Sequence, residues 1–131
     1  MKKILIIGAN GYFGSELLKY LNYRNFTCVG TDINYFKNCN FYKKKNDIIE
    51  TCASKLKSKF LVKFDIVILF AGYSNNPLFK KNEKNFHKKE YKFIKKITDI
   101  CKKNHINLIY PSSCSLYGRA KNKKFLREND E

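Results

Sequence analysis

The first seventeen residues constrain the fold of this chain more than any other stretch. The apolar run Ile4–Ile7 is rich in β-branched residues, as expected of a strand that is buried on both faces of a parallel sheet. Glycines follow at Gly8, Gly11 and Gly14, and the apolar residues after them recur at helical spacing as far as Leu21. A strand, a glycine turn and a helix in this order form the setting in which a dinucleotide-binding fingerprint occurs.

Each of the three glycines has a physical reason to be there. Gly8 permits the tight turn that leaves the strand, and Gly11 lets the backbone approach a pyrophosphate. Gly14 allows the helix to pack closely, and the helix N-terminus offers free N–H groups and a positive dipole end to phosphates. A purely structural turn without a ligand is the alternative, but the strand and the helix that flank it favour binding.

Composition indicates a folded protein whose cysteines are reduced. Its 131 residues suffice for one domain, and contents of 44% hydrophobic and 15% aromatic residues exclude a disordered chain. The five cysteines are odd in number and include no Cys-x-x-Cys pair, which favours free thiols in a cytoplasmic protein. His87 and His105 share no ligand spacing with the cysteines, so we predict no metal site.

The net charge of +16 raises the question of a nucleic acid or a membrane surface as partner. Lysines occur in nearly every segment beside many Asn, Ile, Phe and Tyr residues, a mixture that an AT-rich coding sequence would give. We therefore expect solvated helix faces, with neither a nucleic acid nor a membrane as partner. The apolar stretches are too short for a signal peptide or a membrane span.

An acidic residue stands at the end of the second predicted strand. Asn25–Thr31 reads as that strand, and Asp32 follows it, close to the position about 20 residues after the glycines where an acid binds the adenosine ribose. A carboxylate accepts a hydrogen bond from the 2′-hydroxyl and repels a 2′-phosphate, so the sequence favours NAD over NADP. The alternative is a turn aspartate that precedes Ile33–Asn34.

The rest of the chain continues the alternation of strands and helices. We expect a short strand at Asn40–Lys44, a helix from Asn46–Asp47 to about Phe60, a buried strand at Asp65–Gly72, a helix at Phe86–Lys103 and a strand at Ile106–Tyr110. This pattern predicts an α/β fold, a Rossmann-type doubly wound parallel sheet that is incomplete, with about five strands in the order 3-2-1-4-5. The crevice between the carboxyl ends of strands one and four would then hold the cofactor.

Four motifs together resemble the extended short-chain dehydrogenase/reductase family, the NAD-dependent epimerases and dehydratases of nucleotide sugars. They are Gly8-x-x-Gly11-x-x-Gly14, Asp32, Asp65-x-Val67-x-x-x-Ala71-Gly72 and Ser112-Ser113-x-x-x-Tyr117-Gly118. The resemblance covers the chain from Met1 to about Glu131. It implies hydride transfer between a nucleotide sugar and NAD.

The resemblance also implies roles for individual residues. The implied cofactor-binding residues are Gly8, Asn10, Gly11, Tyr12, Phe13, Gly14, Asp32, Asp47, Ile48, Phe70, Ala71 and Gly72. Within this set, Asp47–Ile48 resembles the pair that contacts adenine, and Ala71–Gly72 resembles the pair whose backbone passes the cofactor ribose. Ser113 matches the catalytic Ser/Thr that binds the reacting hydroxyl or ketone of the sugar.

The family's Tyr-x-x-x-Lys pair, in which a lysine lowers the tyrosine pKa, is not found at its expected place. Tyr91-x-x-x-Lys95 precedes Ser113, and Tyr117-x-x-x-Lys121 follows it too closely. We therefore expect residues 1–131 to be one NAD-binding domain, truncated before the catalytic helix and the substrate domain, that binds NAD without full catalysis.

Two other functions stay open, namely a non-catalytic NAD-binding sensor or partner subunit and, less favoured, a basic nucleic-acid-binding protein. We also expect the isolated chain to be a homo-oligomer or prone to aggregation, because its fifth strand would be an exposed apolar edge.

Overall fold

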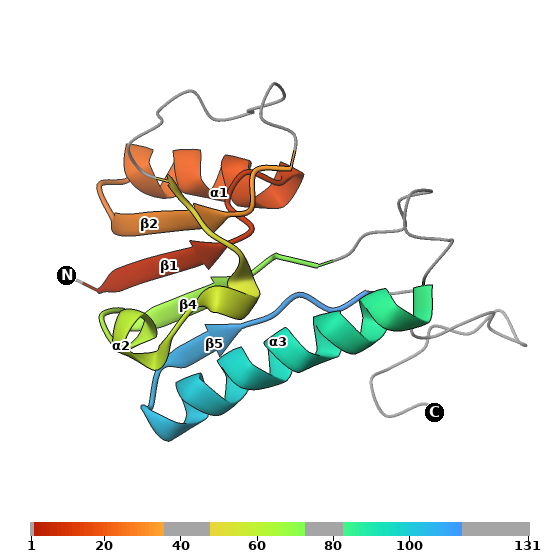
Figure 1. Cartoon of the computed structure of the whole chain (residues 1–131). Helices are drawn as coiled ribbons and strands as arrows, with labels where there is room; N and C mark the ends of the chain where they lie inside the picture. Colours follow the sequence, from red (N-terminus) through yellow and green to blue (C-terminus); the bar gives the residue numbers. More distant parts are fainter. Residues whose placement is uncertain (1, 36–47, 73–82, 114–131) are drawn as a thin grey trace, which may run out of the picture.

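The fold is a five-stranded parallel sheet with helices on both faces, seen in a computed structural model that describes residues 2–35, 48–72 and 83–113 (Figure 1). Its elements are β1 (Lys3–Ile7), α1 (Tyr12–Tyr23), β2 (Thr27–Asp32), β3 (Ile48–Glu50), the 3₁₀ helix η2 (Ala53–Lys55), α2 (Ser58–Leu61), β4 (Ile66–Leu69), α3 (Glu83–Lys103) and β5 (Asn107–Ile109). The strand order is β3-β2-β1-β4-β5 and every pairing is parallel, so the predicted fold class and strand order are confirmed.

β1 is the central strand, and its alternating side chains build two cores. Leu5 and Ile7 pack into a cluster with residues of η2, α2 and α3, whereas Ile4 and Ile6 pack with residues of α1 on the other face. All four side chains are at most 5% exposed. The unbroken apolar run of β1 therefore follows from burial on both faces.

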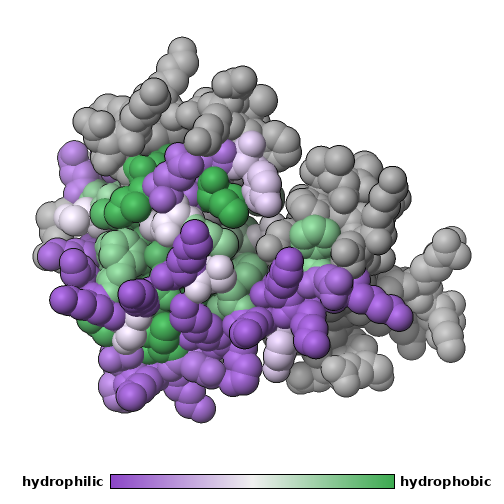
Figure 2. Space-filling view, in the orientation of Figure 1, coloured by the Kyte–Doolittle hydropathy of each residue, from purple (hydrophilic) through white to green (hydrophobic). Residues whose placement is uncertain are grey.

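α3 covers the second face with one apolar stripe. Phe93, Ile97 and Cys101 are buried, while Ile94 and Ile100 are half-buried at the margin of the same cluster. Apart from Lys96, the described lysines of α3 are exposed, and hydrophilic residues are prominent along this part of the surface (Figure 2). The predicted amphipathic helix is confirmed, and it begins three residues earlier than the periodicity suggested.

The predicted helix from Asp47 to Phe60 is wrong. Ile48–Glu50 forms β3 and pairs in parallel with β2, and only the short elements η2 and α2 follow before β4. The β-branched residues Ile48 and Ile49 favour a strand, and they pair with β2. This preference outweighs the tendency of the preceding aspartate to begin a helix. Asp47 itself and the expected strand Asn40–Lys44 lie outside the described residues.

The sheet brings the ends of β1, β2, β4 and β5 to one edge. β4 ends at Leu69, and the next two residues, Phe70 and Ala71, donate their N–H groups to the carbonyl of Ile7 at 2.8 and 2.9 Å. The segment after β4 is thereby fixed beside the glycine turn. Within the described parts of the chain, no helix combines the length and the apolar character that crossing a membrane requires.

Candidate functional site

The glycine turn after β1 is tied to the strands on both sides of it. The N–H groups of Gly8 and Ala9 donate to the carbonyl of Thr31 at 2.8 and 3.1 Å. Gly8 has a φ of +88°, and a Cβ there would lie 2.6 Å from the amide nitrogen of Ala71. Position 8 therefore requires glycine for its backbone conformation and for the close approach of the segment after β4.

Gly11 and Gly14 differ in what surrounds them. A Cβ on Gly14 would lie 2.1 Å from the Gly8 carbonyl oxygen, so glycine at this position allows α1 to pack against the turn. A Cβ on Gly11 would meet only the same oxygen, at 3.4 Å, which is an ordinary contact. The space above Gly11 is open to a ligand, in keeping with the role predicted for it.

The N-terminus of α1 points its free backbone donors at this space. The N-cap is Gly11, which has no side chain to bind those N–H groups, and the first turn carries no acidic residue. The first N–H of α1 with an intrahelical partner belongs to Ser15, which donates to the Gly11 carbonyl at 2.9 Å. The positive end of the helix is thus left for an anionic group.

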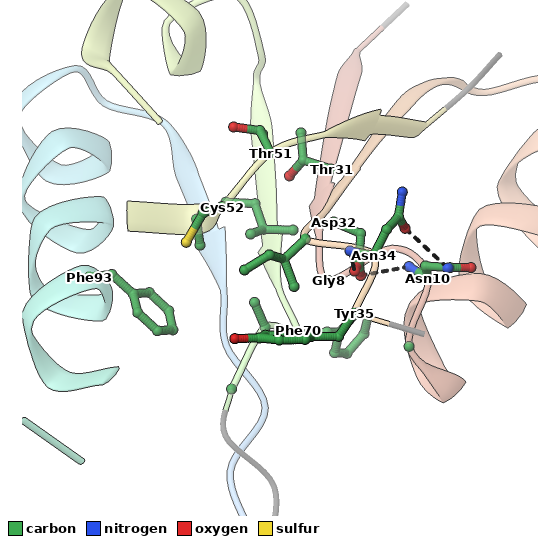
Figure 3. A pocket seen from close by; sticks show the side chains of 16 residues that line it. Gly8, Asn10, Thr31, Asp32, Asn34, Tyr35, Thr51, Cys52, Phe70 and Phe93 are labelled. Atoms are coloured by element: carbon green, nitrogen blue, oxygen red, sulfur yellow. Dashed lines mark hydrogen bonds between the residues drawn. The ribbon is translucent and has the colours of Figure 1, made fainter. Parts of the chain in front are cut away.

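A cavity of about 410 Å³ opens between the glycine turn, the end of β2 and the segment after β3 (Figure 3). We call it the β2 cavity. Its lining residues are Ile7, Gly8, Asn10, Gly11, Thr31, Asp32, Ile33, Asn34, Tyr35, Thr51, Cys52, Ala53, Phe70, Ala71, Gly72 and Phe93. The wall is mostly apolar with a few polar groups, as expected of a small-molecule site.

Asp32 lies at the turn side of the β2 cavity and holds two loops together. Its Oδ2 accepts the N–H of Asn10 at 2.9 Å, and its Oδ1 accepts the N–H of Asn34 at 2.8 Å (Figure 3). The side-chain Nδ2 of Asn10 donates a hydrogen bond to Oδ1 of Asn34 at 3.1 Å. Each carboxylate oxygen can accept a second hydrogen bond, so a ribose hydroxyl could still bind here.

Asn34 adopts the left-handed conformation, with a φ of 53°, which asparagine tolerates better than most residues. Its part in fixing Asp32 was not predicted from the sequence. The Asn residue two positions after a strand-ending acid was the available signal, since this spacing is typical of an Asx turn.

A second cavity, of about 760 Å³, lies across the glycine turn, and we call it the β5 cavity. Its lining residues are Gly8, Gly11, Tyr12, Phe13, Gly14, Phe70, Gly72, Tyr110, Pro111, Ser112 and Ser113. The two cavities share the backbone of Gly8 and Gly11, together with Phe70 and Gly72. Ser113 is thereby brought to the same edge of the sheet as the glycines, although the two are far apart in sequence.

Aromatic rings form one wall of the β5 cavity. The rings of Phe13 and Phe70 stack with their centroids 6.3 Å apart, and Tyr12 meets Phe13 edge-on at 5.4 Å. Tyr12 is 72% and Phe13 70% exposed, so this wall is open toward a ligand. Flat exposed rings of this kind suit contact with a planar or sugar ring.

Of the two predicted adenine contacts, only Ile48 lies within the described residues. Ile48 is half-buried in β3 and packs against the core under α1, so it lines neither cavity. Thr51, Cys52 and Ala53 stand at the wall of the β2 cavity instead. Their position depends on the register of β3, which no local pattern in the sequence indicated.

Tyr91, whose Tyr-x-x-x-Lys spacing precedes Ser113 in the sequence, does not share a cavity with Ser113. It is 68% exposed and borders a groove on the outer side of α3 with Lys95, and it lines neither the β2 nor the β5 cavity. A side-chain hydrogen bond from Lys95 to Asp99, at 2.8 Å, raises the pKa of Lys95. Tyr117 and Lys121 lie outside the described residues.

A buried hydroxyl supports the fit of a polar ligand to the β2 cavity. Thr31 is 0% exposed, and its Oγ1 has no hydrogen-bond partner in the described structure although Thr31 lines the cavity. An open glycine backbone, an uncapped helix N-terminus, a strand-ending acid and this hydroxyl together suit a dinucleotide that spans both cavities.

Comparison with known proteins agrees with this geometry. Residues 4–131 match the NAD dependent epimerase/dehydratase family. The bifunctional polymyxin resistance protein ArnA of Wigglesworthia glossinidia brevipalpis is 30% identical over 136 residues, an alignment that covers 98% of this chain and 20% of ArnA. The chain therefore spans about one fifth of the length of this relative.

Solved structures share the fold. UDP-N-acetylglucosamine 4-epimerase from Methanobrevibacter ruminantium M1 has a TM-score of 0.82 at 21% identity, covering 98% of this chain and 43% of the epimerase. ADP-L-glycero-D-manno-heptose-6-epimerase from Helicobacter pylori has a TM-score of 0.75 at 25% identity, with coverages of 98% and 44%. UDP-glucose 4-epimerase from Brucella ovis, solved in complex with NAD, has a TM-score of 0.73 at 20% identity, with coverages of 94% and 39%. The chain belongs to the NAD-dependent epimerase/dehydratase family, whose cofactor is NAD.

Proposed function

We propose that this chain binds NAD across the β2 and β5 cavities, as the cofactor-binding part of an enzyme that acts on a nucleotide sugar. The observation that carries the proposal is the open space above Gly11, where an added Cβ would meet only one atom, at 3.4 Å. This space lies between the two cavities and faces the uncapped N-terminus of α1. A pyrophosphate would fit there without displacing protein atoms.

The polar groups of the two cavities support one orientation of NAD. We propose that Asp32, which lines the β2 cavity, accepts a hydrogen bond from a hydroxyl of the adenosine ribose. The nicotinamide end would then reach the β5 cavity, which holds Ser113 and the open aromatic wall. The carboxylate of Asp32 would repel a 2′-phosphate, which favours NAD over NADP.

Ser113 is proposed to orient the reacting hydroxyl of the sugar. When bound, NAD would supply the acceptor for the hydride that leaves the sugar carbon. Ser113 can hold the hydroxyl, but a separate base has to remove its proton, because a serine hydroxyl does not ionise near neutral pH. Among the described residues, no tyrosine lies beside Ser113 together with a neighbouring lysine. We therefore propose that the base comes from elsewhere in the protein.

Cofactor binding can be measured directly on the 131-residue chain. The chain has no tryptophan, so the fluorescence of NADH can be followed in titrations without tryptophan background. We expect saturable binding of NADH and binding of NADPH that is weaker by about 10-fold or more, as expected of a 2′-phosphate beside a carboxylate.

Gly11→Val is the matched control for this titration. The added side chain would occupy the space proposed for the pyrophosphate while meeting few protein atoms. We expect it to abolish saturable NADH binding. The free energy of unfolding, measured with urea, should change by only about 1 kcal/mol, the cost of an altered N-cap. Equal NADH affinity in wild type and Gly11→Val, or no saturable binding in the folded wild type, would contradict the proposed site.

Turnover tests the enzymatic part separately. The purified chain would be assayed with a panel of nucleotide sugars beside a version extended through any downstream Tyr-x-x-x-Lys. We expect turnover only in the extended version, and a loss of about 10²-fold or more in its Ser113→Ala variant. Robust turnover by the 131-residue chain that is lost in Tyr117→Phe would instead make Tyr117 the base. NAD binding without turnover in either version would favour a non-catalytic role.

A further inference from the structure

The β2 cavity contains one buried polar group that neither the glycine turn nor Asp32 uses. Thr31 is the penultimate residue of β2, it is completely buried, and its Oγ1 makes no hydrogen bond to the described protein. Burying a hydroxyl without a partner is unfavourable, and most buried side-chain hydroxyls in folded proteins are paired. A hydroxyl left unpaired at the wall of a cavity therefore points to a ligand that pairs with it.

The side chains of Thr31 and Asp32 line different parts of the cavity. Successive side chains of a strand point to opposite faces of its sheet, and the side chain of Asp32 turns toward Asn10 and the glycine turn. Thr31 shares its face with Val29, which packs against the core under η2, α2 and α3. In Figure 3 the side chain of Thr31 lies beside Thr51, whereas that of Asp32 lies beside Asn10 and Asn34.

The surroundings of Thr31 suit a flat base better than a sugar or a phosphate. The face on which it lies is covered by Ala53 of η2 and Phe93 of α3, and Ile33 adds a further apolar side chain to the cavity. The charged group, Asp32, and the free helix N-terminus are both at the turn. A largely apolar slot with the buried Thr31 hydroxyl at its wall favours a heteroaromatic ring that has a hydrogen-bonding edge.

We propose that the Thr31 hydroxyl recognises the adenine base of the cofactor by a hydrogen bond to its edge, and is a specificity-determining residue of the site. This inference rests on the proposed binding of NAD. It differs from the role of Asp32, which concerns the ribose. It also differs from the adenine contact that the resemblance implied at Asp47–Ile48, because Ile48 does not line the cavity.

Thr31→Val removes the hydroxyl while it keeps the shape and the β-branched side chain. We expect the affinity for NADH and for ADP-ribose to fall about 10-fold, because the base loses one hydrogen bond and is left with an unpaired group. The unfolding temperature without ligand should stay equal or rise, because an unpaired buried hydroxyl has been replaced by a methyl group. Thr31→Ser keeps the hydroxyl and should retain an affinity within about threefold of wild type.

Cys52 provides a second readout that does not depend on catalysis. Its thiol lies in the wall of the β2 cavity, whereas Cys28 is similarly half-buried but packs with the core under α1. Bound NAD should slow the alkylation of Cys52 by iodoacetamide, measured by peptide mass spectrometry, and leave Cys28 unchanged. In Thr31→Val the NAD concentration that gives half protection should rise about 10-fold, in step with the affinity.

The outcomes separate this inference from the proposed function. If wild type shows neither NADH binding nor protection of Cys52, the proposed function is wrong and the inference falls with it. If wild type binds NAD and Thr31→Val binds it within twofold, only the role of Thr31 is overturned. A ligand-free unfolding temperature that drops by several degrees in Thr31→Val would also overturn it, because the hydroxyl would then serve the fold.

Discussion

Two regions face each other across the β2 cavity, and they are built in opposite ways. The glycine turn, residues 8–14, is determined by contacts among its own atoms and with the ends of β2 and β4. The segment Ile48–Lys55, which we call the far wall, is held by partners distant in sequence. Its β3 residues pair with β2, the N–H of Thr51 donates to the carbonyl of Asp32 at 2.7 Å, and Lys96 donates to the carbonyl of Ser54 at 2.8 Å.

The turn offers backbone to a ligand, whereas the far wall offers side chains. An added Cβ at Gly8 or Gly14 would come within 3 Å of neighbouring backbone, so the turn has little freedom to vary. The far wall contributes Thr51, Cys52 and Ala53 to the cavity, and it contains no glycine. We therefore propose that the turn binds the phosphates and that the side chains of the far wall determine which ligand fits beside them.

Gly14→Ala should give the largest effect, and it would be an effect on folding. The Cβ would lie 2.1 Å from the Gly8 carbonyl oxygen, and only a shift of α1 could relieve the clash. We expect a loss of about 3 kcal/mol in unfolding free energy, measured by urea denaturation. Gly11→Ala is the control and should lose only about 1 kcal/mol. Equal stability of the two variants would break the distinction between the packing glycine and the ligand glycine.

Asp32→Ala should have a smaller effect, divided between affinity and specificity. The variant removes the acceptor of two backbone N–H groups and the charge that faces the ribose. We expect NADH affinity to fall about 10-fold and the preference for NADH over NADPH to narrow. Asp32→Asn keeps an acceptor but no charge, so its NADH affinity should lie between the other two. Wild type that binds NADPH as tightly as NADH would refute the ribose role.

Ile48→Ala tests whether β3, the first part of the far wall, contributes to ligand binding. Ile48 is half-buried and packs toward the core under α1, so its truncation should cost about 1 kcal/mol of stability. NADH affinity should stay within about twofold, because Ile48 lines neither cavity. A folded Ile48→Ala variant that loses most of its NADH affinity would restore the adenine contact implied by the resemblance.

The smallest effect concerns two thiols that differ in access. Burial raises the pKa of the Cys101 thiol, which lies 1% exposed in the core under α3, so its thiolate forms only at higher pH than usual. Because this pKa is raised in the folded state, any stability linked to it is present at neutral pH and lost under alkaline conditions. At neutral pH Cys52 should be alkylated well before Cys101, and equal rates would mean that the core opens as readily as the cavity wall.

Much of the turn could be read from the sequence, and little of the far wall could. Ile4–Ile7, the glycines and the stripe of α3 are continuous or periodic patterns, and each gave an element close to its observed position. β3 has three residues, and Asp47 before it favoured a helix start, so local preference pointed the wrong way. The contributions of Thr31 and Phe93 depend on which strands and helices become neighbours, which no local pattern records.

The central place of β1 in the sheet has a consequence for the order of synthesis. β1 is made first, yet its two partners are β2 and β4, and β4 ends only at Leu69. Gly8 also packs against Ala71, so the glycine turn lacks one of its neighbours until about that residue has left the ribosome. The emerging chain must therefore hold β1 with one edge unpaired until β4 has been synthesised. Such a strand is exposed to chaperones and to other nascent chains for the several seconds that this length takes to synthesise.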